Sequence, residues 1–367
     1  MLFPPATCPR LIVKIGSALL VDPDGSVRRD WLVGIVADIA DRIGDGQQVA
    51  VVSSGAIALG ARRLGLPKGG RASLEDAQAA AATGQIALSQ AWSETLNAHG
   101  LTAAQMLVTL DDLEDRRRYL NASATLDRLL GLGVVPVINE NDSVATEEIR
   151  FGDNDRLAAR VAQAAGADGV ILLSDIDGLY DRSPADPAAQ HIPRVDRITT
   201  QIEAMAGTGS ASGMGSGGMV SKIAAARIAN SAGTDLAIVS GRVDRPLSTP
   251  ARHTLFVAEK GTSARKAWLA GGLTAKGSIT IDAGAARALR SGASLLPAGV
   301  VSVSGQFERG DVLDICGPDG GVIARGLAEY PGVDAAKIIG MTRDAQGAAL
   351  GYAPRSAMVH RSHMVLL

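Results

Sequence analysis

The sequence is poor in cysteine and in aromatic residues, and each shortage excludes a class of protein. Two cysteines, Cys8 and Cys316, stand far apart among 367 residues. This spacing excludes a disulfide framework and a cysteine-rich metal site, and it favours a reducing compartment. Aromatic residues make up 3% of the chain, whereas glycine occurs 43 times. That balance is typical of an α/β protein with glycine loops rather than an aromatic-lined β-sandwich.

The chain also lacks an excess of charge and any long apolar run. Its formal net charge of −2 argues against non-specific binding to nucleic acid or to an acidic membrane as the main function. The opening residues, MLFPPATCPR, lack the apolar core of a secretory signal. No stretch reaches the roughly 18 uninterrupted apolar residues of a membrane span. We therefore expect a soluble, cytoplasmic protein.

The first 240 residues alternate short apolar strands with longer amphipathic helices. Helical spacing of apolar residues runs over 32–43, and alanine-rich helices are expected over 76–91 and 156–166. This β-α-β order predicts a mainly parallel sheet sandwiched by helices, with its binding site at the carboxyl ends of the strands. The expected strands are Leu11–Ile15, Val49–Ser53, Thr102–Thr109, Val134–Asn139, Val170–Ser174 and Leu236–Val239.

The pattern changes at about Gly277, where short β-like runs alternate with Gly, Pro and Asp turns. We expect an α/β domain over residues 1–260, a connector over 261–276, and a small β-rich pseudo-barrel domain over 277–367. The five histidines form no metal-binding pattern, and His360 and His363, near the end of the chain, are expected to be solvated.

Two strand ends carry candidate ligand-binding residues. Lys14 ends the first strand and is followed by Gly16 and Ser17, a combination that suits an anion site. A turn with a lysine extended to solvent is the alternative. The second strand ends in Ser53 and Ser54 followed by glycine, where hydroxyl and amide donors could hold a carboxylate; a simple helix N-cap is the alternative.

The most distinctive segment is Val137-Ile138-Asn139-Glu140-Asn141-Asp142, followed by Gly152-Asp153-Asn154-Asp155. So many polar groups at the end of a buried strand are costly unless they have partners. Helix caps would use one of them, and a solvated loop is the other alternative. We interpret the segment as a site that grips an amino-acid-like ligand and organises cations.

Two further motifs suit a nucleotide. Ser174, Asp175 and Asp177 follow the next strand and could reach a ribose or a metal-bound water, or serve only as turn residues. Gly213–Lys222 reads GMGSGGMVSK, a glycine loop that leads into a helix with Lys222 in its first turns and forms a phosphate cradle. No strand precedes the loop, so it is not a dinucleotide fingerprint, and it is not a Walker A loop. A flexible surface loop is the alternative.

Together these motifs resemble the amino-acid kinase family, in the branch that phosphorylates glutamate. The resemblance rests on VVSSGA, QMLVT, VVPVINENDSVATEEI, GDNDRL, LLSDIDGLY and GMGSGGMVSK, in this order along nearly the whole chain. The tail, with SLLPAGVVSVSGQFERGDVLDI, resembles a PUA domain. Ser53 and Ser216 stand where the family usually has threonine, and both keep a hydroxyl.

The resemblance implies phosphorylation of the γ-carboxylate of L-glutamate by ATP with Mg²⁺, the first step of proline biosynthesis. It implies that Lys14 contacts the phosphates, that Asp155 orients Lys14 and Lys222, and that Asp142 faces the α-ammonium group. Further implied contacts to glutamate are Ser54 and Asn154; those to the nucleotide are Lys14, Ser174, Asp175, Ser216, Gly217, Gly218, Met219, Val220, Ser221 and Lys222. Feedback inhibition by proline and a homo-oligomer, dimer or tetramer, are implied by the family alone.

Two alternative functions remain open at this point. One is a kinase of another acidic amino acid on the same fold, although a carboxylate such as Asp142 fits a free amine better than an acylated one. The other is RNA binding through the C-terminal domain. From Gly277 onward eight Arg or Lys balance eight Asp or Glu, so the basic stripe typical of RNA-binding surfaces is missing.

Overall fold

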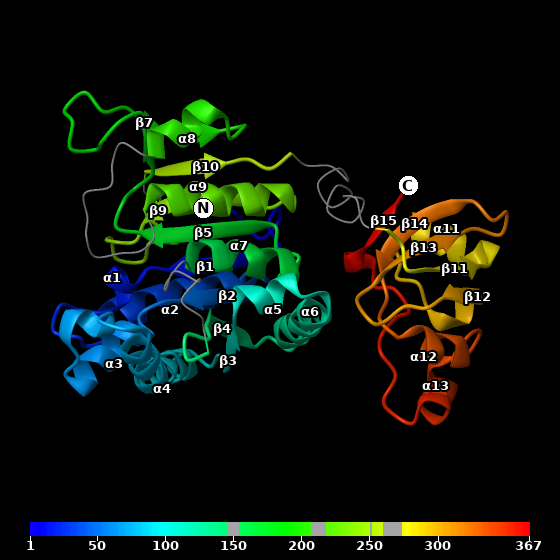
Figure 1. The fold of residues 1–367 in the computed structure, drawn as a ribbon. Helices are drawn as coiled ribbons and strands as arrows, with labels where there is room; N and C mark the ends of the chain where they lie inside the picture. The colour runs from blue at the N-terminus through cyan, green and yellow to red at the C-terminus, as the bar shows by residue number, and fades with distance from the viewer. Residues whose placement is uncertain (145–153, 207–217, 250–251, 260–273) are drawn as a thin grey trace. The chain divides into compact units, whose positions relative to one another are not determined.

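The computed structural model describes residues 1–144, 154–206, 218–249, 252–259 and 274–367. Contacts between residues divide the chain into two compact units. The first comprises Met1–Glu114 and Asn121–Glu259, and the second comprises Asp115–Leu120 and Lys260–Leu367. Each unit has its own sheet (Figure 1).

A mainly parallel sheet forms the centre of the first unit, as the β-α-β pattern predicts. In the described residues it has eight strands, and the pairing of β9 with β10 is antiparallel. In spatial order the strands are β3 (Ala103–Val108), β4 (Val135–Glu140), β2 (Gln48–Ser53), β1 (Arg10–Ile15), β5 (Gly169–Ser174), β9 (Asp235–Ser240), β10 (His253–Phe256) and β8 (Arg194–Val195). The strands β6 (Leu179–Tyr180) and β7 (His191–Ile192) form a separate hairpin.

Helices cover both faces of this sheet (Figure 1). The central strands are apolar at nearly every position because both of their faces are buried. Alternate residues of each strand point to opposite faces, and Leu11, Val13 and Ile15 of β1 share a core with α2 and α4. In the described residues, the helices of this unit are α1 (Ser17–Leu20), α2 (Arg29–Gly44), α3 (Ala56–Leu64), α4 (Leu74–Ala98), α5 (Leu110–Glu114), α6 (Arg116–Gly131, of which the residues up to Leu120 are assigned to the second unit), α7 (Asn154–Ala165), α8 (Thr200–Ala206) and α9 (Met219–Ser231).

Helices α3 and α4 pack with their backbones in close contact, and two glycines permit this. A Cβ atom added at Gly60 would lie 1.8 Å from the carbonyl oxygen of Ala80. One added at Gly84 would lie 1.9 Å from the carbonyl oxygen of Ala56. Only a residue without a side chain fits at either point, so the two glycines set the position of α4.

The second unit is β-rich. Among its described residues, five strands lie in the order β12 (Val300–Gly305), β11 (Gly277–Ile281), β13 (Val312–Cys316), β14 (Val322–Leu327) and β15 (Met364–Leu366). Neighbours are antiparallel except β11 and β13, which are parallel. Its helices are α11 (Ala283–Arg290), α12 (Gly332–Lys337) and α13 (Arg343–Leu350). The predicted fold class, an α/β domain followed by a small β-rich domain, is confirmed.

One expectation about side chains is wrong. His363 is buried rather than solvated, with 5% of its surface exposed. The end of the chain forms β15, which pairs with β14, and this pairing carries the residue just before the strand into the interior. None of the helices in the described parts of the chain combines the length and apolar character that a membrane span requires.

Candidate active site

Polar residues gather at the carboxyl ends of neighbouring parallel strands of the first unit. Lys14 lies in β1, Ser53 ends β2, Asn139 and Glu140 end β4, and Ser174 ends β5. These ends lie at one edge of the sheet because the strands pair in parallel register. The carboxyl edge is where open α/β sheets bind their ligands.

Two lysines from distant parts of the chain meet on one carboxylate. Lys14 Nζ lies 2.6 Å from Asp155 Oδ1, and Lys222 Nζ lies 3.0 Å from Asp155 Oδ2. All three residues are buried: Lys14 is 7% exposed, Lys222 5% and Asp155 1%. Lys14 points away from the α2 side of the sheet, towards α7 and α9, whose first turns carry Asp155 and Lys222.

The two lysines favour the ionised form of Asp155. Burial by itself opposes ionisation of Asp155, but the charges and hydrogen bonds of Lys14 and Lys222 outweigh it and hold the pKa of this carboxyl below its usual range. Two ammonium groups therefore share one carboxylate in a buried place. Such an arrangement suits an anionic ligand, because the low local dielectric strengthens the attraction.

Beside the lysines, a second group consists of amides and hydroxyls. Asn154 Nδ2 donates to Ser54 Oγ at 2.6 Å, to Asn139 Oδ1 at 3.3 Å and to the carbonyl oxygen of Ser53 at 3.4 Å. Asn139 Nδ2 in turn donates to Gln85 Oε1 at 2.8 Å. Asn154 and Asp155 are consecutive residues at the start of α7, so that helix joins the amide group to the lysine group.

Asn154 of this group and Asp142, in the turn after β4, each have a buried oxygen without a hydrogen-bond donor within the described residues. These oxygens are Asn154 Oδ1 and Asp142 Oδ1. Burial raises the pKa of Asp142 to about 6, and the charge of Arg71 opposes this only in part. Buried acceptors without donors are costly. A ligand with an ammonium group beside such an oxygen would supply the missing donor.

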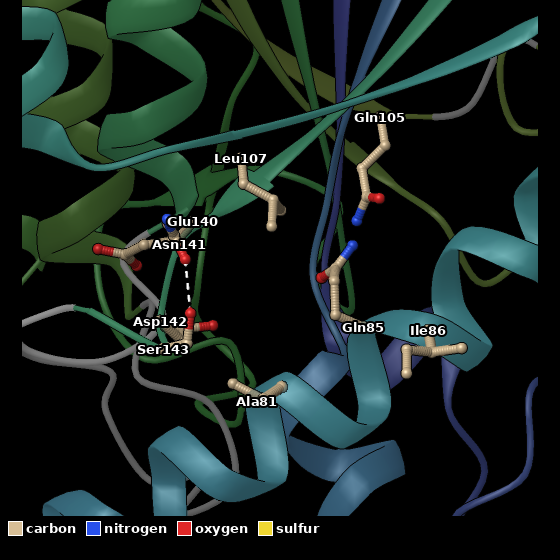
Figure 2. A pocket seen from close by; sticks show the side chains of 10 residues that line it. Ala81, Gln85, Ile86, Gln105, Leu107, Glu140, Asn141, Asp142 and Ser143 are labelled. Atoms are coloured by element: carbon tan, nitrogen blue, oxygen red, sulfur yellow. Dashed lines mark hydrogen bonds between the residues drawn. The ribbon is translucent and has the colours of Figure 1, made fainter.

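A pocket of about 250 Å³ opens beside Asp142 (Figure 2). It lies between α4, β3 and the turn that follows β4, and Gln85 and Gln105 point towards one another across it. On its other side, Ser143 Oγ donates to Asn141 Oδ1 at 2.7 Å. Its lining residues are Ala81, Ala82, Gln85, Ile86, Gln105, Leu107, Glu140, Asn141, Asp142 and Ser143.

The residues expected to contact a nucleotide lie on the β5 and α9 side. Ser174 Oγ donates to Asp175 Oδ1 at 3.1 Å, and Arg242 Nη2 lies 3.8 Å from Asp175 Oδ2. Gly218 is the N-cap of α9, whose first turn contains Met219, Val220, Ser221 and Lys222. Ser216 and Gly217, also expected to contact phosphate, lie outside the described residues. Asp177 accepts from the hydroxyl of Tyr180 at 2.8 Å, as a turn residue does.

Of the residues that orient the amide group, Gln85 was not predicted from the sequence, and Asn139 and Glu140 were predicted only as part of a ligand-binding segment. Gln85 is half-buried in an alanine-rich helix, and Asn139 and Glu140 are buried at the end of β4. The signal for Asn139 and Glu140 was present in the INEND segment. For Gln85, a polar residue inside a run of alanines was the only indication.

Comparison with known families agrees with this geometry. Residues 9–240 match the model of the amino acid kinase family, and residues 277–345 match that of the PUA domain. Because the first match covers more than half of the chain, the protein belongs to the amino acid kinase family.

Individual relatives cover the whole chain. A protein of Sphingopyxis alaskensis named glutamate 5-kinase is 81% identical over 366 residues, which is 100% of both chains. A glutamate 5-kinase of Zymomonas mobilis is 61% identical and covers 100% of this chain and 93% of its own. A glutamate 5-kinase of Novosphingobium aromaticivorans is also 61% identical, with 99% and 97% covered.

Proposed function

We propose that this protein transfers the γ-phosphoryl group of ATP to the γ-carboxylate of L-glutamate. The products are ADP and L-glutamate 5-phosphate, and the reaction is the first step of proline biosynthesis. The observation that carries the proposal is the pair of buried lysines on Asp155, one residue from an amide group with unsatisfied acceptors. The relatives named glutamate 5-kinase support the choice of substrate.

The amide group and Asp142 would bind the amino acid. An α-ammonium group placed near Asp142 Oδ1 and Asn154 Oδ1 would donate to two oxygens that have no donor within the described residues. Ser54, whose hydroxyl meets Asn154 at 2.6 Å, would face a carboxylate of the substrate. An N-acylated amino acid would place a neutral amide opposite Asp142, so the site favours a free amine.

The lysines and the start of α9 would bind the polyphosphate. Lys14 and Lys222 would neutralise the charge of the phosphoryl group during transfer, while Asp155 holds them in place. Ser174 and Asp175 would contact the nucleoside, and Ser216 to Lys222 would wrap the phosphates. The carboxylate acceptor is ionised at neutral pH, so no general base is required. Catalysis then consists of positioning in line and of charge neutralisation.

We expect Mg²⁺ to bind together with ATP, through phosphate oxygens and water, rather than through a set of protein side chains. Within the described residues no three His, Cys, Asp or Glu side chains are grouped to hold a metal, and both oxygens of Asp155 face lysines. Mg²⁺ is commonly bound through phosphate oxygens and water. It would supply further neutralisation of the phosphate charge.

The proposal is tested by replacing each lysine and measuring glutamate-dependent release of ADP. Lys14→Ala and Lys222→Ala should each lower kcat by about 10²–10³-fold, as expected for the loss of one preorganised electrostatic group. Lys337→Ala is the matched control, because Lys337 pairs with Asp334 at 2.8 Å on the surface of the second unit. Near-wild-type turnover by either of the first two variants would remove that lysine from the mechanism.

The substrate is tested with a panel of acidic amino acids and ATP. L-Glutamate should give the highest kcat/KM, ahead of L-aspartate and N-acetyl-L-glutamate. A preference for either of the other two would select the alternative kinase function. The same assay with added proline tests feedback inhibition, and light scattering tests for a homodimer or homotetramer.

The proposal also assigns a role to each of the two domains. Residues 1–260 would be the catalytic domain and residues 277–367 a scaffolding or regulatory domain. Tight, salt-sensitive retention of tRNA on a filter would instead favour RNA binding by the second domain.

A further inference from the structure

Two buried tryptophans donate their indole N–H groups to the carboxyl edge of the sheet, at different strands. Trp92, in α4, donates from Nε1 to Ser53 Oγ at 3.0 Å. Trp31, in α2, donates from Nε1 to the carbonyl oxygen of Gly241 at 2.7 Å. The chain has three tryptophans, and the third, Trp268, lies outside the described residues.

We propose that Trp92 and Trp31 are positioning residues. Trp92 would position the amino-acid side of the site, which contains Ser54, Asn139 and Asn154. Trp31 would position the nucleotide side, which contains Ser174 and Asp175. The inference rests on the proposed function, because that function assigns one substrate to each side. Neither tryptophan is a catalytic residue. Each acts through the backbone or hydroxyl group that its indole holds.

The path from Trp92 to the amino-acid side consists of short hydrogen bonds. Ser53 Oγ, which accepts from the indole, donates to the carbonyl oxygen of Ser54 at 3.3 Å. The carbonyl oxygen of Ser53 and the hydroxyl of Ser54 both accept from Asn154 Nδ2. Trp92 and Ser53 are each 0% exposed. Because no water reaches this contact, the indole fixes the conformation of the Ser53–Ser54 turn.

The path from Trp31 leads to the other side. The N–H of Gly241 donates to the carbonyl oxygen of Ser174 at 2.7 Å, so the indole and the end of β5 hold the same residue through its two neighbouring peptide groups. A Cβ atom added at Gly241 would lie 2.3 Å from Leu19 Cδ1, which confines the backbone further. Ser174 is followed by Asp175, and Arg242 follows Gly241 at 3.8 Å from that carboxylate.

The two tryptophans belong to the same hydrophobic core, together with residues of β1, β2 and β5. A role in packing alone would therefore give both substitutions the same effect. A role in positioning predicts opposite effects on the two substrates. Replacement by phenylalanine keeps an aromatic ring and removes the N–H donor, so it separates these possibilities.

The test measures KM for L-glutamate and for ATP in the full-length chain. Loss of one buried hydrogen bond converts to a change of about 3- to 10-fold. Trp92→Phe should raise KM for glutamate by that factor and leave KM for ATP within about twofold, and Trp31→Phe should do the reverse. Leu96→Ala, which truncates a buried residue of α4 in the same core, should lower Tm and leave both KM values within about twofold.

A double variant tests the path through Ser53. Trp92→Phe combined with Ser53→Ala should have no larger effect on KM for glutamate than Ser53→Ala alone. Additive effects, or equal changes in both KM values for the two tryptophan variants, would overturn the proposal. So would a fall in Tm with neither KM changed.

Failure of the proposed function would look different. In that case the wild-type protein would release no ADP on addition of glutamate. The positioning role is then decided by calorimetric titration with a non-hydrolysable ATP analogue. Weaker binding by Trp31→Phe and unchanged binding by Trp92→Phe would support it, and equal affinities would refute it.

Discussion

Asp155→Asn probes the group of charges at the centre of the site. The substitution keeps the shape of the side chain and removes its charge. Asp155 is 1% exposed and lies within 3.0 Å of both lysines. Two buried ammonium groups would then face each other without the negative charge of Asp155, so both folding and phosphate binding should respond.

The expected loss of stability is large. Removal of one partner from a buried ion pair costs about 3–5 kcal/mol. In a unit of this size, each kcal/mol lowers Tm by about 2–4 °C, so Asp155→Asn should unfold roughly 10 °C below the wild type. Its kcat should also fall by about 10²-fold or more, because the lysines lose the group that orients them.

Nucleotide should rescue this variant in particular. The phosphates of ATP would supply the negative charge that Asp155 no longer provides, and binding to the native state raises Tm. The gain in Tm on adding ATP, measured by calorimetry, should therefore be larger for Asp155→Asn than for the wild type. The control is Asp38→Asn, another buried carboxylate, which pairs with Arg245 at 3.0 Å. An equal gain for both variants, or a Tm equal to wild type for Asp155→Asn, would refute the reasoning.

Two further substitutions test the buried carboxylate of Asp142 and the close contact between α3 and α4. The pKa of Asp142 is raised to about 6 by burial, so the native state holds this proton more tightly than the unfolded chain does, and the associated stability is lost as pH rises from about 4 through 6. Asp142→Asn should thus stabilise the protein by up to about 3 kcal/mol at pH 7.5 and not at pH 4, as measured by urea titration. In the wild type, kcat/KM for glutamate should decline below about pH 6. Gly84→Ala should lower the unfolding free energy by about 3 kcal/mol or more, because its methyl group would overlap the carbonyl of Ala56; a change below 0.5 kcal/mol would contradict this packing.

The sequence predicted the longer strands of the sheet closely and its shortest strands poorly. The strands β1, β2, β3, β4, β5 and β9 lie within one residue of their expected bounds. For the central strands β1, β2, β4, β5 and β9 the reason is that a strand buried on both faces is a continuous apolar run with few alternatives, whereas β3, at one edge of the sheet, is only partly buried. In contrast, β10 has four residues and β8 has two. Such short segments acquire their conformation from the neighbour they pair with, and local sequence does not specify that neighbour.

The site, like the sheet, could be predicted from the sequence only in part. Parallel register brings Lys14 near the ends of β2 and β5, so a shared site could be predicted from the strand order alone. The contact between Gln85 and Asn139, and that between Trp92 and Ser53, could not. They depend on the rotation of α4 about its axis, which the close approach at Gly84 sets. No local pattern encodes that rotation.

The alternation of side chains along the strands explains why the two substrates would bind next to each other and yet contact different side chains. Ser53 and Asn139 point to the α4 side of the sheet, where amides and hydroxyls gather. Lys14 points to the α7 and α9 side, where the charges gather. Asn154 and Asp155, one peptide bond apart, reach one group each. On the proposed function, the distance between acceptor and phosphate donor would therefore be set by the first turn of α7, and a shift of that turn by one residue would place a carboxylate among the amides and take the carboxylate of Asp155 away from the lysines.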